Sequence, residues 1–356
     1  MVLSNAGEQL AKRGEAVGNS MATITQVAKH AGVSTKTVSR VMRNYPHISP
    51  KTRLKVEEAI QDLTFTPLSI SRNNRMTESL SIGMLYGDPS SGYQARLNHA
   101  VLKACSDARR YLAVELFDEG GVDWVLQVEA FLNRTNVQSM ILVPPICDAI
   151  GVHELLEERG VRYVLVSPSR PVAGSVAIIM DDRLASKEIT EHLLELGHTR
   201  IGHICGHPDH VVTLLRQQGF EEAMVRAGLA DSEHMIVASG KFRFRDSLEA
   251  AEKMLAEPNR PTAIFAANDE MASAVVMAAH RQRLQVPDDL SVAGFDDAPI
   301  ASSMWPDLTT ISQPFEAIGR SSIEALAETT AGPGKRSQTI ILPHKLIKRA
   351  STAPLS

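Results

Sequence analysis

The first apolar pattern in the chain has the spacing of a short helix. Val27, Ala28 and Ala31 recur on one side of a helical turn. The Thr-Ile-Thr-Gln run ahead of them has the form of a capping box, which satisfies two backbone amides at the start of a helix. Gly32 supplies the permissive backbone that allows the helix to end. The pattern predicts a helix that begins near Thr23 and ends before Gly32.

A second helix follows almost at once. Ser34 is a favoured cap, and Val38, Val41 and Met42 form the inward stripe of the helix after it. Two short helices joined by so tight a turn predict a helix-turn-helix, whose second helix enters the major groove of DNA. The outward positions of that helix carry side chains that can contact bases or phosphates. These are Thr35, Lys36, Ser39, Arg40 and Arg43.

A third helix and a polar stretch complete the first part of the chain. Ser49 and the proline after it give a cap and a first-turn proline, and apolar residues then recur at helical spacing from Val56 to Leu63. Pro67 ends the pattern, because proline cannot continue a helix. Residues 68–79 are polar and have weak helix propensity, which predicts a linker.

From Leu80 onwards, apolar runs of strand length alternate with amphipathic helical stretches. This alternation indicates parallel β-α-β units, and the runs fall into two sets. The expected fold is an all-α helix-turn-helix headpiece followed by an α/β body of two lobes, each a doubly wound parallel sheet. Ligands of such sheets bind beyond the carboxyl ends of the strands, which predicts a cleft between the lobes. The predicted strands are 81–86, 113–117, 139–143 and 163–166 in the first lobe and 201–205, 235–237, 263–267 and 291–295 in the second.

Charge divides the chain in the same way. Residues 21–80 hold nine Lys or Arg against four Asp or Glu, a net +5, whereas residues 81–356 carry −9 and residues 1–20 are balanced. The net charge of −4 for the whole chain hides this division. A basic first domain on an acidic body favours contact with phosphates at one end only, as expected of a protein that binds nucleic acid.

Composition excludes several other classes of protein. No run approaches 18 apolar residues, so we expect no contact with a membrane, and residues 1–20 lack the apolar core of a secretory signal. Cys105, Cys147 and Cys205 are far apart in sequence, which favours free thiols in a reducing cytoplasm. Gly-x-Ser-x-Gly, P-loop and Gly-x-Gly-x-x-Gly motifs are absent, and we expect neither catalytic residues nor a cofactor.

Several short motifs in the first domain are typical of one family. They are Ala31-Gly32-Val33-Ser34, Thr37-Val38-Ser39-Arg40-Val41, Ser49-Pro50-Lys51-Thr52-Arg53 and Phe65-Thr66-Pro67. In this order and spacing they resemble the headpiece of the lactose-repressor (LacI/GalR) family of bacterial regulators. The resemblance implies a sequence-specific repressor of carbohydrate-utilisation genes, which acts in the cytoplasm as a homodimer on a roughly palindromic operator in double-stranded DNA.

The resemblance also implies DNA contacts outside the second helix. These are Thr23, Ile24, His47, Ser49 and Thr52. In the family the linker becomes a hinge helix that enters the minor groove, and Ile70, Ser71 and Arg72 fall at matching hinge positions. Asn74 stands where the family has a wedge leucine. Side chains that wedge between bases are normally apolar, so Asn74 could instead contact DNA by a hydrogen bond to a base edge, or the hinge could bend its site less. We expect weaker bending of the operator.

The body resembles the periplasmic sugar-binding-protein fold with which this family binds its effector. Its landmarks include Leu196-Gly197-His198-Thr199-Arg200, Gly294-Phe295-Asp296-Asp297 and Gln313-Pro314-Phe315. By resemblance, the effector-contact positions are Arg216, Phe242, Asn268, Asp296 and Phe315, with Gln313 beside them. The residues after the first strand that should face the same cleft are Tyr86, Asp88 and Tyr93. This set suits a sugar, whose hydroxyls need polar partners and whose C–H face needs an aromatic ring.

These patterns divide the chain into five parts. Residues 1–20 are expected to be a disordered extension, or to precede the true start at Met21. Residues 21–67 are the headpiece, 68–79 the hinge, 80–345 the effector-binding and dimerisation domain, and 351–356 a C-terminal tail. The first lobe takes about 80–181 and 313–342, and the second about 182–312 and 343–350. Residues 345–356 lack a leucine heptad, so we expect a dimer and not a tetramer. Effector binding is expected to change the relation of the lobes and, through the hinges, the affinity for the operator.

Three alternatives remain. A nucleoside or purine could replace the sugar, because Phe242 stacks equally well on a base. A sugar-binding transport or sensing protein shares the two-lobed body, but it would need export and no headpiece. His203, Cys205, His207 and His210 have the residue types and spacing of metal ligands. On the strand predicted there, His203, Cys205 and His207 would share one face. The matching strand in the family is ordinary core, and we expect no metal.

Overall fold

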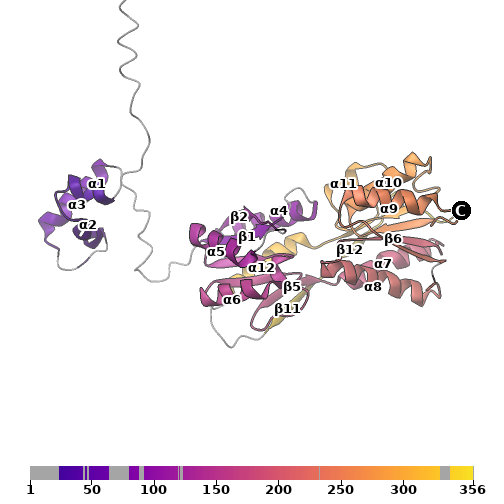
Figure 1. The fold of residues 1–356 in the computed structure, drawn as a ribbon, viewed down its shortest axis with the longest axis horizontal. Helices are drawn as coiled ribbons and strands as arrows, with labels where there is room; N and C mark the ends of the chain where they lie inside the picture. Colours follow the sequence, from indigo (N-terminus) through magenta and orange to yellow (C-terminus); the bar gives the residue numbers. More distant parts are fainter. Residues whose placement is uncertain are drawn as a thin grey trace, which may run out of the picture. The chain divides into compact units, whose positions relative to one another are not determined.

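The structure is a computed structural model. It describes residues 24–42, 45, 48–63, 80–87, 92–118, 120, 123–231, 233–328 and 337–355, without the side chains of Ile24, Ser39 and Met42. The chain divides into two compact units, residues 1–77 and 78–356 (Figure 1).

Three short helices form the described part of the first unit. They are α1 (Ile24–His30), α2 (Thr35–Met42) and α3 (Pro50–Asp62). Ser34 Oγ accepts a hydrogen bond from the amide of Thr37 at 3.1 Å, and Ser49 Oγ accepts one from the amide of Thr52 at 3.2 Å. Both predicted caps are therefore confirmed. The core of this unit consists of the predicted apolar stripes, namely Val27, Ala28, Ala31, Val38, Val41, Val56 and Ala59.

The second unit contains two α/β lobes. In the first lobe, six parallel strands have the order β11-β5-β4-β3-β1-β2. They are β1 (Ser81–Tyr86), β2 (Tyr111–Leu116), β3 (Ser139–Leu142), β4 (Arg162–Val166), β5 (Val176–Met180) and β11 (Gln338–Leu342). A short 3-10 turn, η1 (Ile146–Asp148), follows β3. Residues of α4 (Gly92–Asp107) and α12 (Phe315–Glu328) pack on one face of the sheet, and residues of α5 (Trp124–Thr135) and α6 (Ile150–Glu158) pack on the other.

The second lobe repeats this arrangement around a smaller sheet. Four parallel strands have the order β7-β6-β8-β9. They are β6 (Ile201–Cys205), β7 (Met235–Ser239), β8 (Ala263–Ala266) and β9 (Ser291–Ala293). Residues of α7 (Asp182–Glu195) and α8 (Val211–Arg226) cover one face, and residues of α9 (Phe244–Ala256) and α10 (Asp269–Arg281) cover the other. A short helix, α11 (Pro299–Ser303), follows β9.

Three segments join the two lobes. β5 leads into α7, β10 (Thr310–Ser312) leads into α12, and β11 leads into β12 (Lys345–Ile347). β10 and β12 form an antiparallel pair, so two of the three segments are hydrogen-bonded to each other. A change in the orientation of one lobe relative to the other must therefore bend all three segments.

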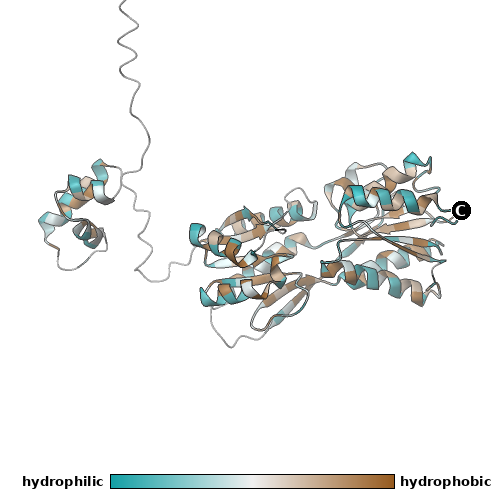
Figure 2. Cartoon of the chain, viewed as in Figure 1, coloured by the Kyte–Doolittle hydropathy of each residue, from teal (hydrophilic) through white to brown (hydrophobic). Residues whose placement is uncertain are grey.

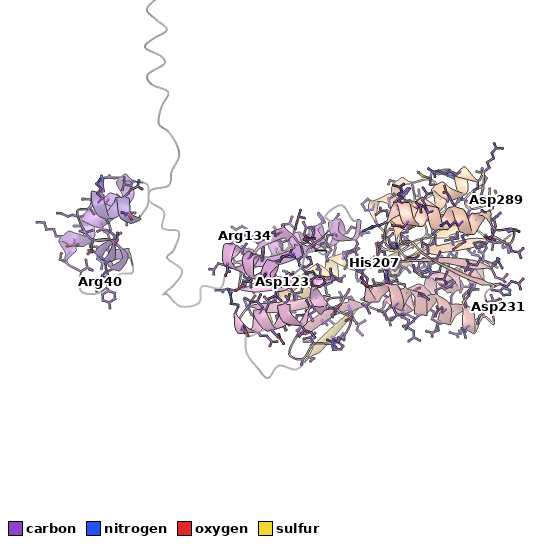
Figure 3. All side chains as sticks on the ribbon, in the orientation of Figure 1. Arg40, Asp123, Arg134, His207, Asp231 and Asp289 are labelled. Carbon is purple, nitrogen blue, oxygen red and sulfur yellow. The ribbon has the colours of Figure 1, made fainter. Side chains whose placement is uncertain are left out.

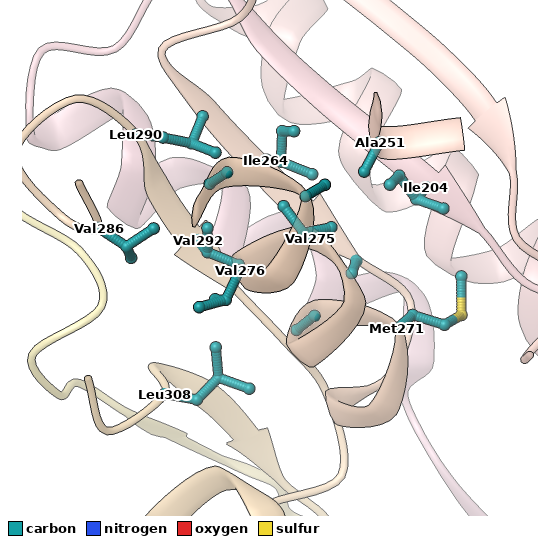
Figure 4. Packing of buried hydrophobic residues seen from close by; sticks show 14 of the residues in the cluster. Ile204, Ala251, Ile264, Met271, Val275, Val276, Val286, Leu290, Val292 and Leu308 are labelled. Carbon is teal, nitrogen blue, oxygen red and sulfur yellow. The ribbon is translucent and has the colours of Figure 1, made fainter. Parts of the chain in front are cut away.

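Apolar residues concentrate on the strands and on the helix faces that cover them (Figure 2). Every residue of β6, β8 and β9 is buried, as expected of a parallel sheet that is covered on both faces. Figure 4 shows one of the resulting cores, where Ile264 and Val292 of the sheet pack against Met271 and Val275 of α10. Within the described ranges, none of the helices has the length and apolar content needed to cross a membrane.

The predicted α/β fold is confirmed, with differences at its edges. The eight predicted strands are present within a few residues, whereas β5, β10, β11 and β12 were not predicted. β11 lies at the edge of its sheet and is largely exposed, and its apolar run is only three residues long. Residues 351–355, expected to be a tail, are bonded to the second lobe. Ser351 Oγ donates to the carbonyl of Val292 at 2.6 Å, and the amide of Leu355 donates to the carbonyl of Leu196 at 2.8 Å.

Candidate functional site

The outward face of α2 carries exposed polar and basic side chains. Thr35, Lys36 and Arg40 are exposed, and Arg40 is labelled in Figure 3. The guanidinium carbon of Arg40 lies 5.7 Å from the ring centroid of Tyr45. Lys and Arg on such a helix can donate to guanine and to phosphates, and Thr can meet a thymine methyl. The first unit therefore has the shape and chemistry of a helix-turn-helix recognition surface.

The start of α3 carries two further residues that were predicted to contact DNA. The hydroxyl oxygens of Ser49 and Thr52 lie 2.8 Å apart, and both belong to the N-terminal turn of the helix. The partial positive charge of a helix N-terminus favours a phosphate at this position. Six other predicted contacts lie outside the described residues, namely Thr23, Arg43, His47, Ile70, Ser71 and Asn74. Only the helical backbone is described for Ile24 and Ser39.

A cavity of about 420 Å³ lies between the two lobes of the second unit. Its wall includes residues that directly follow β1, β3, β4, β6, β7 and β8, so it opens at the carboxyl ends of both sheets, as predicted. The volume is in the range typical of pockets for small ligands. The predicted effector residues that line it are Tyr93, Arg216, Phe242, Asn268, Asp296 and Gln313.

The cavity wall includes a buried ion pair. Arg216 Nε and Nη2 each lie 2.8 Å from Asp182 Oδ1, and both side chains are about 95% buried. Arg216 Nη1 donates to the carbonyl of Ala267 at 2.5 Å, and the guanidinium stacks 3.6 Å from the ring centroid of Phe295. Burial raises the pKa of Asp182, and Arg216 opposes that shift. These contacts fix the orientation of the guanidinium group, so that its remaining N–H groups can donate to a ligand in a defined direction.

Asp296 is the second buried acid of the cavity. Its Oδ1 accepts a hydrogen bond from Gln313 Nε2 at 2.6 Å. The backbone φ of Asp296 is 110°, a value that residues other than glycine rarely adopt. Burial raises the pKa of Asp296 to about 6, against the lowering effects of Arg216 and Gln313. The next residue, Asp297, also has a positive φ, of 56°. The chain is thus held in a strained turn at the point where it presents this carboxyl group.

Asn268 and its neighbour Asp269 anchor the wall beside Asp296. Asn268 Oδ1 caps α10 by accepting from the amide of Met271 at 2.8 Å. Asp269 accepts from the amide of Ala298 and from Thr310 Oγ1, both at 2.6 Å. Burial is the main cause that raises the pKa of Asp269 to about 8, followed by the charge of Asp296. Asp269 thereby ties the turn that carries Asp296 to α10.

Phe242 supplies an aromatic ring from the second lobe. It follows Lys241, and both residues have the left-handed backbone, with φ of 57° and 53°. The ring lies directly against Gly206, where an added Cβ would come within 2.0 Å of Phe242 Cζ. His210 meets the ring edge-on, at 5.7 Å between centroids. A glycine at 206 is therefore required for the ring to lie where it does.

Two predicted effector residues that the structure describes do not line the cavity. Tyr86 packs against the core of the first lobe. Phe315 is only 3% exposed and lies behind the wall, 5.4 Å from the ring of Tyr93 between centroids. Its ring faces the core between α4 and α12 and is not part of the cavity wall, so contact between Phe315 and a ligand stays a prediction. Asp88 lies outside the described residues.

Sequence reasoning missed much of the cavity wall. The missed polar and aromatic residues are Gln94, Trp124, Ser167, Asp182, His207, Asp209, His210, Lys241 and Arg243. His207, labelled in Figure 3, lies at the end of the second lobe that faces the first. Most of these residues follow strands directly, so their position after a strand was the signal that could have found them. Trp124 had no such signal, because it opens helix α5.

The residues with metal-like spacing divide between two environments. His203 is fully buried, is stacked on Phe220 and Phe265, and bonds through Nδ1 to the carbonyl of Phe265 at 3.0 Å. Burial lowers the pKa of His203 to about 4. His207 and His210 instead line the cavity. Across the described ranges, no group of three or more potential ligands is arranged to hold a metal ion.

Each unit matches the model of a known domain family. Residues 23–68 match the bacterial regulatory proteins of the lacI family, and residues 190–352 match the periplasmic binding protein-like domain. A helix-turn-helix followed by a two-lobed body with a ligand cavity defines the class of protein, a transcription regulator that binds DNA. More particularly, the chain belongs to the lacI family of bacterial regulatory proteins.

Similar proteins over nearly the whole chain are transcription regulators. The ribose operon repressor of Escherichia coli K12 is 34% identical over 93% of this chain and 100% of its own length. The regulator DegA of Bacillus subtilis is 32% identical over 94% and 99%, and the repressor PurR of Photobacterium profundum is 30% identical over 94% and 100%. The chain is accordingly a sequence-specific, DNA-binding transcriptional repressor.

Solved structures of two transcription regulators share the fold. The lac repressor dimer bound to operator and the anti-inducer ONPF has a TM-score of 0.72 at 28% identity, covering 94% of this chain and 100% of its own. A complex of the transcriptional regulator CelR with cellobiose has a TM-score of 0.68 at 27% identity, covering 93% and 99%. The predicted combination of headpiece and two-lobed body is therefore confirmed.

Proposed function

We propose that this repressor binds a small sugar in the cavity and that the sugar controls its affinity for an operator. The observation that carries the proposal is a set of buried, oriented polar groups, Arg216, Asp296 and Gln313, in the same cavity as the ring of Phe242. A sugar offers hydroxyls at its rim and C–H bonds on its face, and this arrangement suits both. The sugar is bound and released unchanged, so the proposal includes no catalytic step.

A nucleoside or purine is the second candidate effector. It is favoured by the aromatic side chains that line the cavity from both lobes, Trp124 and Phe242, because such rings stack on a base as well as on a sugar. The sugar is favoured by Asp296, whose ionised carboxylate can accept hydrogen bonds from two hydroxyls. Relatives named for a ribose operon and for a cellobiose complex agree with the first candidate.

We infer that the repressor acts in the cytoplasm as a homodimer on a roughly palindromic operator. A twofold dimer presents two recognition helices, and the operator reflects that symmetry. The dimeric lac repressor on its operator supports this arrangement. Asn74 is expected to reduce bending of the operator, because an amide is a poor apolar wedge. A strong central kink in a circular-permutation gel-shift experiment would contradict the expectation.

A ligand panel tests the proposed effector. The purified full chain is heated with D-ribose, D-glucose, cellobiose, adenine or adenosine, and the shift in melting temperature is measured. A ligand at 100 times its Kd stabilises the state that binds it by about 2.7 kcal/mol, which is readily measured. A shift with adenine or adenosine alone would favour the second candidate, and no shift with any compound would contradict both.

Two variants show whether a shift arises in this cavity. Asp296→Asn removes the charged acceptor and should abolish or strongly reduce the shift. Asp288→Asn is the matched control, because Asp288 is exposed and does not line the cavity. The two variants carry the same change of side chain, and a shift that Asp296→Asn retains in full would show that the compound binds elsewhere.

Operator selection tests the proposed roles on the DNA side. Lys36 projects from the exposed face of α2, so Lys36→Ala should change the preferred base at one position of each half-site, by about 1–3 kcal/mol. Thr52 lies in the first turn of α3, so Thr52→Ala should weaken binding to all duplexes alike. Duplexes selected from a random library by each variant distinguish the two effects. An unchanged preference for Lys36→Ala would contradict its role as a base contact.

A further inference from the structure

One side chain of the first lobe contacts the turn that carries Asp296. Arg96, on α4, donates through Nη1 to the carbonyl oxygen of Asp296 at 3.2 Å and lies 3.9 Å from the carboxylate of Asp297. The first residue of α4, Gly92, lies so close to Ala298 that an added Cβ would come within 3.2 Å of the alanine Cβ. The start of α4 is therefore packed on residues 296–298, across the boundary between the lobes.

Within the second lobe, the same turn is held firmly. Asp297 Oδ1 pairs with Arg349 Nη2 at 2.6 Å, and Arg349 Nη1 also donates to the carbonyl of Leu308 at 2.8 Å. The amide of Asp296 donates to the carbonyl of Ile311 at 2.9 Å. Asp297 thus lies between two arginines, Arg96 from the first lobe and Arg349 from the second. The turn behaves as part of the second lobe, and Arg96 is a connection from the first.

Arg96 itself is ordered by an aromatic ring. Its guanidinium carbon lies 5.0 Å from the ring centroid of Phe315, a distance at which a cation is attracted to the face of the ring. Phe315 in turn meets Tyr93 of α4 edge-on. This arrangement gives Phe315 a role in the site without contact with the ligand, because it supports Tyr93 of the cavity wall and the arginine behind it.

We propose that Arg96 is the positioning residue that couples occupancy of the cavity to the relation of the two lobes. The inference rests on the proposed function, because it requires a ligand to engage the carboxylate of Asp296. The carboxylate that binds a ligand hydroxyl and the carbonyl oxygen that accepts from Arg96 both belong to Asp296. A ligand that shifts Asp296 therefore also moves Arg96 and helix α4. The first lobe begins directly after the linker from the headpiece, and its displacement is therefore the one that reaches the DNA-binding unit.

A pair of variants on the same helix tests the inference. Arg96→Met removes the charge and both polar contacts but keeps a long apolar stem. Lys103→Met makes the same kind of change at the exposed Lys103, which pairs with Glu316 at 3.2 Å. Full-length chains are compared on a duplex selected from a random library by the unaltered chain. Affinity is measured without added compound and with saturating D-ribose or cellobiose, and melting shifts with the same sugars show whether each variant still binds them.

The expected result separates binding from coupling. In the unaltered chain and in Lys103→Met, a bound sugar should change the affinity for the duplex by about fivefold or more. In Arg96→Met the melting shift should remain, while the change in affinity falls to about twofold or less. Arg96→Lys restores a charged donor and should recover part of the change. An Arg96→Met chain that binds the sugar and keeps the full change would overturn the inference.

A second measurement keeps the inference testable if neither sugar acts on the unaltered chain. That outcome contradicts the proposed sugar control, and hydrogen exchange without ligand then decides the role of Arg96. The amides of Asp296 and Ala298 are bonded to Ile311 and Asp269 within the second lobe. If Arg96 holds this turn, Arg96→Met should speed their exchange by about tenfold, whereas Lys103→Met should not. Equal rates in the two variants would overturn the inference.

Discussion

At the scale of single residues, the cavity depends on charges that lie out of water. Asp182, Asp269 and Asp296 are buried, and burial is the largest cause that raises the pKa of each. Arg216 lowers the pKa of Asp182 and Asp296 and is itself almost fully buried. The guanidinium therefore presents donors to a ligand and also compensates the negative charge of the buried carboxylates.

Removal of Arg216 should destabilise the second unit strongly. Arg216→Ala leaves Asp182 buried without its partner, and breaking a buried pair in this way costs about 3–5 kcal/mol. The control is Arg226→Ala on the same helix. Arg226 is 73% exposed and pairs with Glu191 at 3.6 Å, so its loss should change stability by about 1 kcal/mol or less. Urea denaturation measures both, and similar losses in the two variants would contradict the expectation.

The raised pKa of Asp296 should give the protein a recognisable pH dependence of stability. The folded value of about 6 lies above the ordinary value of 3.8, so the folded state holds this proton more tightly than the unfolded state. The resulting contribution to stability is fully present below about pH 4 and is lost as the pH rises through 6. Asp296→Asn should therefore show a smaller fall in the free energy of unfolding between pH 4 and pH 6 than the unaltered chain or Asp288→Asn. Equal falls in all three chains would show that the Asp296 carboxyl is already ionised at pH 4.

At the scale of elements, periodicity and capping predicted most of the fold. The Ser34 and Ser49 caps and the buried runs of β6, β8 and β9 are local signals, because a cap acts within one turn and a covered strand is apolar throughout. The edge strand β11 gave a weaker signal, since the strand is largely exposed and its apolar run is only three residues long. A pattern that depends on burial cannot identify an element that is not buried.

The site was less predictable than the fold because side-chain direction is set by packing. Resemblance placed Arg216 and Asp296 at the cavity, and both line it. The same resemblance placed Phe315 there, but its ring turns toward Tyr93 and Arg96. Trp124 lines the cavity from the start of a helix, where an aromatic residue is equally consistent with a core position. The direction of a side chain at the start of a helix depends on neighbours that are distant in sequence.

The fit of Phe242 against Gly206 makes a prediction about the loop after β6. Gly206→Ala would place a Cβ within 2.0 Å of the Phe242 ring, so the ring must move. An aromatic contact of this kind is worth about 0.5–1.5 kcal/mol, and its loss should weaken binding of any sugar found in the ligand panel by about two- to tenfold. Titration calorimetry with that sugar measures the change.

Gly228→Ala is the control for Gly206→Ala. Gly228 has a φ of 76° and open space around it, so alanine there strains the backbone without touching the cavity. This variant should lose stability but bind the sugar with unchanged affinity. If Gly206→Ala also binds the sugar with unchanged affinity, Phe242 does not stack on it.

At the scale of the whole molecule, two functions belong to two units with separate cores. The first unit is basic and closes a small core around Val27, Val38 and Val56, whereas the acidic body builds larger cores on both faces of two sheets. Binding to DNA releases counterions, so its affinity falls as the salt concentration rises, whereas the affinity for a neutral sugar does not depend on counterion release. The two binding reactions can therefore be distinguished by salt as well as by mutation.

The separate cores predict that full-length protein unfolds in two steps, each stabilised by its own ligand. Calorimetry should show a selected duplex raising the transition of the first unit and the sugar raising that of the second, because a ligand stabilises only the state that binds it. Val38→Ala and Val275→Ala make the same change at fully buried positions of the two units, each costing about 2 kcal/mol. Val38→Ala should lower the first transition and weaken DNA binding while the sugar-induced shift persists, and Val275→Ala should lower only the second. If both ligands and both variants shift one single transition, the two cores unfold as one cooperative unit.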